Sequence, residues 1–350
     1  MTRIRDRLWE PLSHYQMSKA MNWRPGMGIV RKEIAGRIVA VGSAMPAQVT
    51  TNADLAAEFG VTEEWIERRC GVERRYVATT ETTTTLGAAA ARKALADSAV
   101  RPDLLLCATF SPDRVLTPIA PSIAYHAGLG SIAAFDLNAA CSGGVTALIS
   151  ALAFISSGLF RNVLVVATDT TTKHLDPADL KTRMLFSDGA AAILLGPPRA
   201  DATTLHVRAH RFGSDGTGAG FFSADWIARQ PGARPYVRMD GASLFQFAVE
   251  TGVRTLSTLC ADADLPPEHL TRILMHQANA RIAGAIRKSF AISKEKWPET
   301  IRMGNVAGAS LLFLLVQEFT RRSFVCGELL ALIAFGAGLT WAGTILEAGC

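Results

Sequence analysis

The chain has 350 residues, of which 49% are hydrophobic and 19% charged, and its formal net charge is +5. This composition is typical of a soluble globular protein that is long enough for a large core, and the charge suits an acidic partner. The sequence has no arginine- or lysine-rich block with interleaved aromatic residues, so we do not expect a nucleic-acid partner.

The N-terminus and the cysteines favour a protein of the reduced cytoplasm. The first residues include Arg3, Arg5 and Arg7 but not the apolar segment of a secretory signal. The six cysteines lie far apart, with no CxxC pair and no metal-ligand spacing. We therefore expect neither a disulfide framework nor a metal site.

Short apolar runs recur in the same order in the two halves of the chain. They are residues 103–108, 162–167 and 190–195, and then residues 272–277, 328–333 and 341–346. Such runs between helical segments indicate buried strands of α/β layers, and their repeated order predicts a duplication. The segment 196–201, which is rich in proline and glycine, divides the chain into residues 34–200 and 201–350.

Two stretches, residues 137–160 and 329–346, contain no charged side chain. Their length alone would allow each of them to span a membrane. Glycines interrupt both stretches, however, and the second has a strand-turn-strand pattern. We expect buried helices and strands instead of membrane spans.

The segment AACSGG at residues 139–144 makes Cys141 a candidate nucleophile. A cysteine at a strand-to-helix turn lies where unpaired N–H groups and the helix dipole favour its thiolate. The local sequence leaves open that Cys141 is one more buried small residue.

Two later segments supply partners for such a cysteine. Residues 272–279 read as an apolar strand that ends at His276, and residues 303–310 read as a small-residue turn that carries Asn305 and opens a helix. Under the duplication, the turns of Cys141 and Asn305 are equivalent and face one pocket between the halves. Taken singly, a histidine is often structural, and Asn305 has the alternative role of a helix cap.

With these motifs in order, the chain resembles the β-ketoacyl-acyl-carrier-protein synthase III family. The resemblance also includes residues 65–72, 186–190, 245–248 and 335–343, and it runs from about Gly36 to Glu347. It implies an α/β, thiolase-like fold of duplicated αβαβα halves with buried central helices. It leaves residues 1–33 as an N-terminal extension of unassigned role.

The resemblance implies a two-stage decarboxylative Claisen condensation. Cys141 would take an acyl group from an acyl-coenzyme A primer, and the carbanion formed from malonyl-acyl carrier protein would then attack the acyl-cysteine. His276 and Asn305 would donate hydrogen bonds to the enolate oxygen, each worth about 3–4 kcal/mol by analogy with oxyanion holes. Coenzyme A enters as part of the substrate, and no metal or organic cofactor is expected.

A second oxyanion site is implied for the acyl-transfer intermediate. The backbone N–H groups of Cys141 and Ala337 would form it. The family usually has glycine at the position of Ala337. The assignment therefore requires a negative φ at this alanine.

Recognition of coenzyme A is implied for Trp65, Arg69 and Arg281. Trp65 and Arg69 match the family's aromatic and basic pair that sandwiches the adenine. A second family arginine would fall near Leu180, with Lys181 adjacent, so this part of the pattern is altered. A surface tryptophan also has the simpler role of a packing residue.

The partners implied are an acidic acyl carrier protein and a second copy of the chain. Arg281, Arg287 and Lys288 would present a basic helix face to the carrier, unless they are an ordinary solvated face. The family buries a strand-rich face of its first half in a homodimer.

Other functions of the same fold stay open from the sequence. Residues 111–121, 186–188 and 304–310 depart from the common family pattern, so the primer cannot be read and a specialised ketosynthase or acyltransferase of secondary metabolism is an alternative. A hydroxymethylglutaryl-coenzyme A synthase would need an added general acid, for which we find no carboxylate motif. An inactive scaffold subunit is the alternative from another class, although Cys141, His276 and Asn305 are all present.

Overall fold

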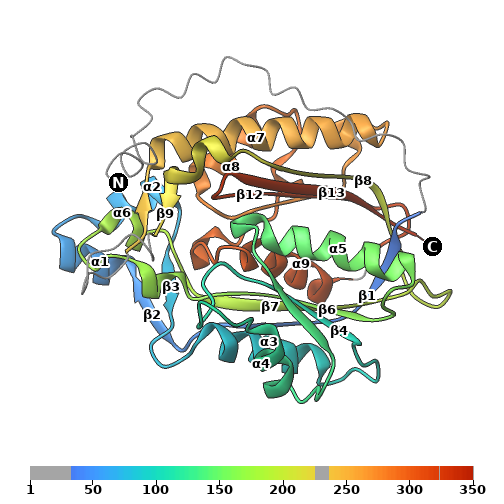
Figure 1. Cartoon of the computed structure of the whole chain (residues 1–350). Coiled ribbons are helices and arrows are strands. Elements are labelled where there is room, and N and C mark those ends of the chain that lie inside the picture. The colour runs from blue at the N-terminus through green and yellow to red at the C-terminus, as the bar shows by residue number, and fades with distance from the viewer. Residues whose placement is uncertain (1–32, 225–235, 323, 350) are drawn as a thin grey trace, which may run out of the picture. The chain divides into compact units, whose positions relative to one another are not determined.

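Two stacked sheets with helices between and outside them form the body of the structure (Figure 1). The computed structural model describes residues 33–224, 236–322 and 324–349. The N-terminal extension expected over residues 1–33 lies outside the described residues, apart from Glu33. These described residues belong to one compact unit.

Six of the described strands lie within a few residues of the six apolar runs of the sequence. The strands are β1 Ala35–Ala44, β2 Gln48–Thr51, β3 Arg74–Val77, β4 Leu104–Ala108, β5 Ala133–Leu137, β6 Val163–Asp169, β7 Gly189–Gly196, β8 Leu205–Ser214, β9 Phe222–Ser223, β10 Arg238–Met239, β11 Arg272–Met275, β12 Leu329–Gly336 and β13 Thr340–Ala348. The α-helices are α1 Asn52–Phe59, α2 Glu63–Cys70, α3 Thr83–Leu95, α4 Ala120–His126, α5 Gly143–Ser157, α6 Leu180–Arg183, α7 Gly241–Asp262, α8 Ala280–Lys288 and α9 Ala309–Arg321.

The order of strand directions repeats in the two halves of the chain. The two stacked sheets are joined into one main sheet, in the order β11-β12-β13-β8-β1-β7-β6-β4-β5, because β1 and β8 pair at Ala35 and Gly36. In the first half, β7 is antiparallel to β1 and β6, whereas β4 is parallel to β6 and β5. In the second half, β13 is antiparallel to β8 and β12, whereas β11 is parallel to β12. The duplicated α/β fold that the sequence predicts is confirmed, while the division between residues 200 and 201 stays a prediction.

Helices α5 and α9 lie between the two sheets (Figure 1). Leu148 and Leu152 of α5 and Leu312 and Leu315 of α9 share one core cluster with strand residues of both sheets. The stretch Ala140–Ser157 is the one helix of the described residues that is long and apolar enough to cross a membrane. Its position between the two sheets explains that composition, because 56% of the stretch is buried against apolar neighbours.

The outer faces of the two sheets are covered by the remaining long helices. Helix α3 and helix α4 pack on the sheet of β4, β6 and β7, and their cluster includes Ala90, Ala91 and Ile123. Helix α7 packs on β12, β13 and β8, and α8 packs beside α7. The layers therefore alternate as α, β, α, β and α (Figure 1).

The strand ends bring distant segments to one edge of the sheets. Strand β5 ends at Leu137, shortly before Cys141, and β11 ends at Met275, directly before His276. Strand β12, which is parallel to β11, ends at Gly336 before Ala337. Because parallel strands end at the same edge, residues that are far apart in sequence meet there.

One expectation about the cysteines is wrong. Cys70, Cys107, Cys141 and Cys260 are free, as the sequence predicts. Cys326 is disulfide-bonded, however. The wide spacing of the cysteines in the sequence gives no sign of this bond, since spacing does not show which chain segments meet.

Candidate active site

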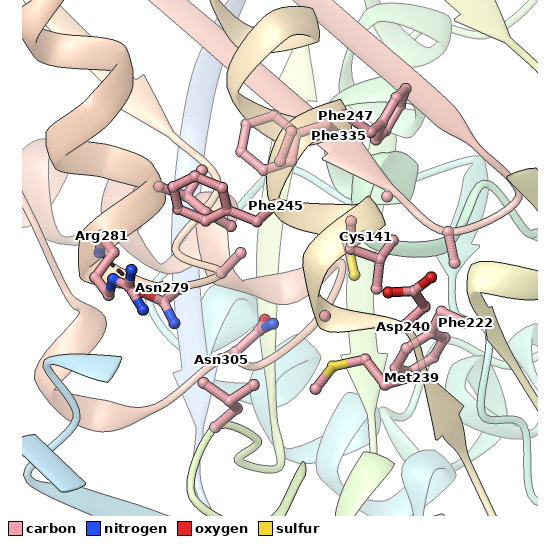
Figure 2. Close-up of a pocket in the computed structure, with 18 of the residues that line it drawn as sticks. Cys141, Phe222, Met239, Asp240, Phe245, Phe247, Asn279, Arg281, Asn305 and Phe335 are labelled. Atoms are coloured by element: carbon pink, nitrogen blue, oxygen red, sulfur yellow. Dashed lines mark hydrogen bonds between the residues drawn. The ribbon is translucent and has the colours of Figure 1, made fainter. Parts of the chain in front are cut away.

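A cavity of about 750 Å³ opens between the two halves of the chain (Figure 2). Its lining includes Cys141, His276, Asn305 and Ala337, which come from four separate segments. Arg69 and Arg281 line it as well. Most of the remaining wall is apolar and contains Met184, Leu185, Phe186, Phe222, Met239, Phe245, Phe247 and Phe335.

Cys141 lies in a turn with an unusual backbone. Ala140 has φ +47°, in the left-handed region that residues other than glycine rarely adopt. The turn continues as a short 3-10 helix and then as α5, so Cys141 lies at the N-terminal end of a buried helix. Gly336 packs against it, because a Cβ at that position would lie 2.7 Å from the Cys141 nitrogen. The shape of the turn therefore depends on a glycine from the other half.

The surroundings of Cys141 favour a thiol. Burial raises the pKa of the Cys141 thiol to about 12, and the Asp169 carboxylate adds to this rise. The backbone N–H groups of Cys141 and Ala337 lower the pKa and only partly compensate. The thiolate that we expected from the helix N-terminus alone is therefore not the resting state at neutral pH.

Ala337 meets the condition that its expected role requires. It is absent from the non-glycine residues with positive φ, which among the described residues are Ala140, Asp264 and Ala307. Its N–H acts on the sulfur of Cys141 together with the N–H of Cys141 itself. Two backbone donors therefore converge on the position of the nucleophile, as an oxyanion site requires.

His276 is buried and uncharged. His276 follows β11, and its backbone N–H donates to the carbonyl oxygen of Ile333 at 2.8 Å. Burial lowers the pKa of the His276 imidazole to about 3, so the ring is neutral at physiological pH. The centroid of the Phe335 ring lies 5.7 Å from that of the imidazole, and Nδ1 is buried without a hydrogen-bond partner. A neutral imidazole has one N–H to donate and needs no counter-ion.

Asn305 is held by the turn that precedes α9. Its Oδ1 accepts hydrogen bonds from the N–H of Ala307 at 2.9 Å and from Oγ of Ser310 at 3.3 Å. Its own N–H donates to the carbonyl oxygen of Leu185 at 2.8 Å. With Oδ1 fixed by two donors, the Nδ2 end of the carboxamide is available to the cavity that Asn305 lines (Figure 2).

Trp65 and Arg69 stack on each other instead of framing a slot. The guanidinium carbon of Arg69 lies 4.0 Å from the centroid of the Trp65 ring. A planar base between them would need about twice that separation, so the two side chains leave no slot in this arrangement, and the adenine sandwich stays a prediction. Trp65 is 36% exposed, and it offers one aromatic face that is backed by a cation. Lys181 lines the cavity in the region where the family has its second arginine.

The three basic residues of α8 do not share one face. Arg281 and Lys288 are seven residues apart and point the same way, whereas Arg287 points about 120° away from Arg281. Arg287 forms an ion pair with Glu299, with 3.3 Å between Nη1 and Oε1. Arg281 lines the cavity and stacks on Phe245 at 5.7 Å, and Lys288 is exposed.

Sequence reasoning missed two polar residues at the site. Ser310 fixes the carboxamide of Asn305, and the fully buried Asp169 acts on Cys141. Asp169 ends the strand β6, and an acidic residue at the carboxyl end of a buried strand is a usable signal in α/β folds. Ser310 belongs to the small-residue turn of residues 303–310, five residues after Asn305.

Comparison with protein families gives two matches. The model for 3-oxoacyl-[acyl-carrier-protein] synthase III matches residues 135–216, which include Cys141. The model for the C-terminal part of the same family matches residues 260–348, which include His276, Asn305 and Ala337. The matched segments thus contain all four residues that meet at the floor of the cavity.

Individual proteins agree with these matches. The chain is 35% identical to β-ketoacyl-[acyl-carrier-protein] synthase III 1 of Bacillus anthracis over 317 residues, which covers 89% of this chain and 98% of the relative. The 3-oxoacyl-(acyl carrier protein) synthase III of Pseudomonas aeruginosa superimposes with a TM-score of 0.83 at 33% identity, covering 90% and 99% of the two chains. The priming β-ketosynthase of the R1128 polyketide biosynthetic pathway gives 0.82 at 31% identity, covering 93% and 99%.

The raised pKa of Cys141 predicts how alkylation depends on pH. Only the thiolate attacks iodoacetamide, so below pH 12 the rate should increase about tenfold for each pH unit. We expect no plateau between pH 7 and pH 9. The measurement is the mass-spectrometric rate of adduct formation at Cys141, with Cys141→Ala as the control for other sites. A plateau near pH 8 would show that the thiol ionises in the ordinary range.

Proposed function

The chain belongs to the 3-oxoacyl-[acyl-carrier-protein] synthase III family of acyl-transferring condensing enzymes, and on this basis we propose that Cys141 is its nucleophile. We further propose that His276 and Asn305 donate to the enolate of the extender. The observation that carries the proposal is the convergence of these three side chains on one cavity. They come from the end of β5, the end of β11 and the turn before α9.

The first step is acyl transfer from an acyl-coenzyme A primer. The sulfur of Cys141 attacks the thioester carbonyl, and the N–H groups of Cys141 and Ala337 hold the oxygen that becomes negative. The carbon–sulfur bond to coenzyme A then breaks, and the proton that leaves Cys141 is carried away on the coenzyme A thiol. Because Cys141 rests as a thiol, proton transfer accompanies this step.

The second step is condensation with malonyl-acyl carrier protein. Loss of carbon dioxide leaves an enolate, whose oxygen accepts hydrogen bonds from His276 and from Nδ2 of Asn305. The carbanion attacks the acyl-cysteine, and the thiolate of Cys141 leaves and is reprotonated. Burial supports this role, because the pKa of about 3 keeps His276 neutral, and the hydrogen bonds to the enolate are formed in a site of low polarity.

The same proposal extends to the substrates, the cofactors and the cellular location of the enzyme. The apolar wall of the cavity suits an apolar acyl group, and Arg69, Lys181 and Arg281 suit the phosphates of coenzyme A. The thiol and the hydrogen-bond donors supply the chemistry, so we propose that no metal or organic cofactor takes part. We also propose that the enzyme acts in the cytoplasm. The similarity to the R1128 priming ketosynthase supports a biosynthetic ketosynthase as the second candidate within the family.

We also propose a homodimer that covers the edge strand β5. Strand β5 ends the main sheet, and its Phe135 is 41% exposed. The segment before it adds Val115, Leu116 and Tyr125, which are 74%, 94% and 74% exposed. An open sheet edge beside exposed apolar side chains favours pairing with a second copy.

His276 separates the two half-reactions. We expect His276→Ala to form acyl-enzyme, more slowly than the wild type, while decarboxylation of the malonyl thioester falls by about 10²–10³-fold because one enolate donor is lost. Asn305→Ala should share only the second defect. Cys141→Ala should form no acyl-enzyme and still decarboxylate. Mass spectrometry of the acyl adduct and release of labelled carbon dioxide measure the two steps. If His276→Ala decarboxylates the malonyl thioester at the wild-type rate, the condensation mechanism is wrong and plain acyl transfer is the better interpretation.

Carrier docking depends on the shared face of Arg281 and Lys288. Changing either residue to glutamate should raise KM for carrier-linked malonate and largely spare acylation by coenzyme A thioesters, with a smaller effect at high salt. Lys93→Glu on α3 is the matched control, since it makes the same charge change on the opposite outer layer (Figure 1). Equal losses in both half-reactions would indicate damage to the fold or to the shared cavity.

The dimer proposal is tested by sedimentation velocity of the full chain at micromolar concentration. We expect the wild type to sediment as a dimer and Phe135→Asp to shift toward the monomer, because a carboxylate would be buried at the interface. Val325→Asp, which alters another apolar side chain with 63% exposure, is the control and should stay dimeric. A monomeric wild type would contradict the proposal.

A further inference from the structure

Asp169 is a buried carboxylate that joins the two halves of the chain. It ends β6 and has no exposed surface. Its Oδ1 accepts hydrogen bonds from Oγ1 of Thr109, from the N–H groups of Phe110 and Ser111, and from Oγ of Ser111, at 2.8–3.2 Å. Its Oδ2 accepts from the N–H of Gly308 at 3.3 Å, which lies 139 residues away.

The contact with Gly308 completes the hydrogen bonding of the turn that carries Asn305. In that turn the N–H of Val306 donates to Oγ of Ser310, and the N–H of Ala307 donates to Oδ1 of Asn305. Gly308 is the N-cap of α9, and no side chain of its own segment caps the helix. Asp169 therefore binds the N–H of the N-cap residue itself and puts a negative charge at the N-terminus of α9.

The same carboxylate lies next to the turn of the nucleophile. A Cβ built on Gly308 would lie 3.3 Å from the carbonyl oxygen of Ala140 and 3.5 Å from Oδ2 of Asp169. A Cβ built on Gly144, near the start of α5, would lie 2.3 Å from the carbonyl oxygen of Gly308. Asp169 thus lies where the N-terminal ends of α5 and α9 meet, and its charge opposes a second negative charge on Cys141.

We propose that Asp169 is a positioning residue for both half-reactions, which fixes the Asn305 turn through Gly308 and places a negative charge beside the turn of Cys141. The inference rests on the proposed roles of Cys141 and Asn305 and extends them. Each function uses a different part of the residue. The hydrogen bond needs Oδ2 as an acceptor, whereas the effect on the sulfur needs the negative charge.

Among the described titratable groups around this point, Asp169 is the one whose charge acts on the Cys141 sulfur. His276 on the β11 side is neutral, and Cys107 on β4 is a thiol whose pKa is raised well above its usual value by burial. Asp113 is engaged by the N–H groups of Thr83 and Thr84, and Asp136 by those of Ile119 and Ala120. Asp240, Arg69, Lys181 and Arg281 line the same cavity as Cys141. Burial raises the pKa of Asp169 to about 6, so it is mostly ionised above pH 7.

The decisive variant is Asp169→Asn, which keeps the shape and removes the charge. The single carbonyl oxygen of the new carboxamide is best placed at the Oδ1 position, where four donors meet it. Its NH₂ group then faces the N–H of Gly308, so the Asn305 turn loses its anchor. We expect the decarboxylation of malonyl thioester to fall at least about tenfold. In contrast, alkylation of Cys141 by iodoacetamide at pH 7.5 should become about tenfold faster, as a thiol pKa lowered by one unit requires. A purely structural role would slow both reactions.

Thr109→Val provides a second, milder variant. It removes one donor from Oδ1, which raises the pKa of Asp169 and leaves more of it neutral at pH 7. Alkylation should then be faster than in the wild type at pH 7 and equal to it at pH 9, where Asp169 is ionised in both proteins. Circular dichroism and thermal unfolding establish that each variant is folded.

Asn305→Ala in the same assays separates failure of this inference from failure of the proposed function. If Asn305→Ala decarboxylates like the wild type, the proposed function is wrong. If Asn305→Ala is impaired but folded Asp169→Asn shows unchanged or slower alkylation, the role of Asp169 is overturned. If Asp169→Asn does not fold, equal alkylation rates of Thr109→Val and the wild type at pH 7 overturn that role instead.

Discussion

The close approach of two helix N-termini is the constraint on which the site depends. Helices α5 and α9 begin side by side between the sheets, and a Cβ on Gly144 would lie 2.3 Å from the carbonyl oxygen of Gly308. No larger residue fits there without moving the backbone. This contact sets the distance between the Cys141 turn and the Asn305 turn, and both turns use an alanine at φ +47°, Ala140 and Ala307.

Placing these helix ends in the core also sets the charges of the site. Burial disfavours every ion, so it raises the pKa of Cys141 to about 12 and lowers that of His276 to about 3. The two groups are thus a thiol and a neutral imidazole at physiological pH, and both are uncharged before a substrate binds. Developing charge on the substrate is then met by fixed donors, with little solvent to reorganise.

The sequence alone predicts the parts of this arrangement that are local. The apolar runs predict the strands to within a few residues, and the motifs around Cys141, His276 and Asn305 predict the turns that the structure contains. What the sequence does not show are the partners of side chains. Arg287 pairs with Glu299, Arg69 stacks on Trp65, and Cys326 forms a disulfide. Neither composition nor helical spacing predicts any of these three contacts. Asp169 is the clearest example, because its proposed role depends on a hydrogen bond from Gly308, which is 139 residues away in the sequence.

The duplication explains why Asp169 and Ala337 lie where they do. Strand β6 of the first half corresponds to β12 of the second half, and each strand ends against the helix turn of the opposite half. The end of β12 supplies Gly336 and Ala337 to Cys141, whereas the end of β6 supplies Asp169 to Gly308. One contact presents N–H donors to a nucleophile, and the other presents an acceptor to a backbone N–H. The ends of two corresponding strands thus have opposite polarity: one offers N–H donors to the sulfur of Cys141, and the other offers an acceptor that holds the Asn305 turn.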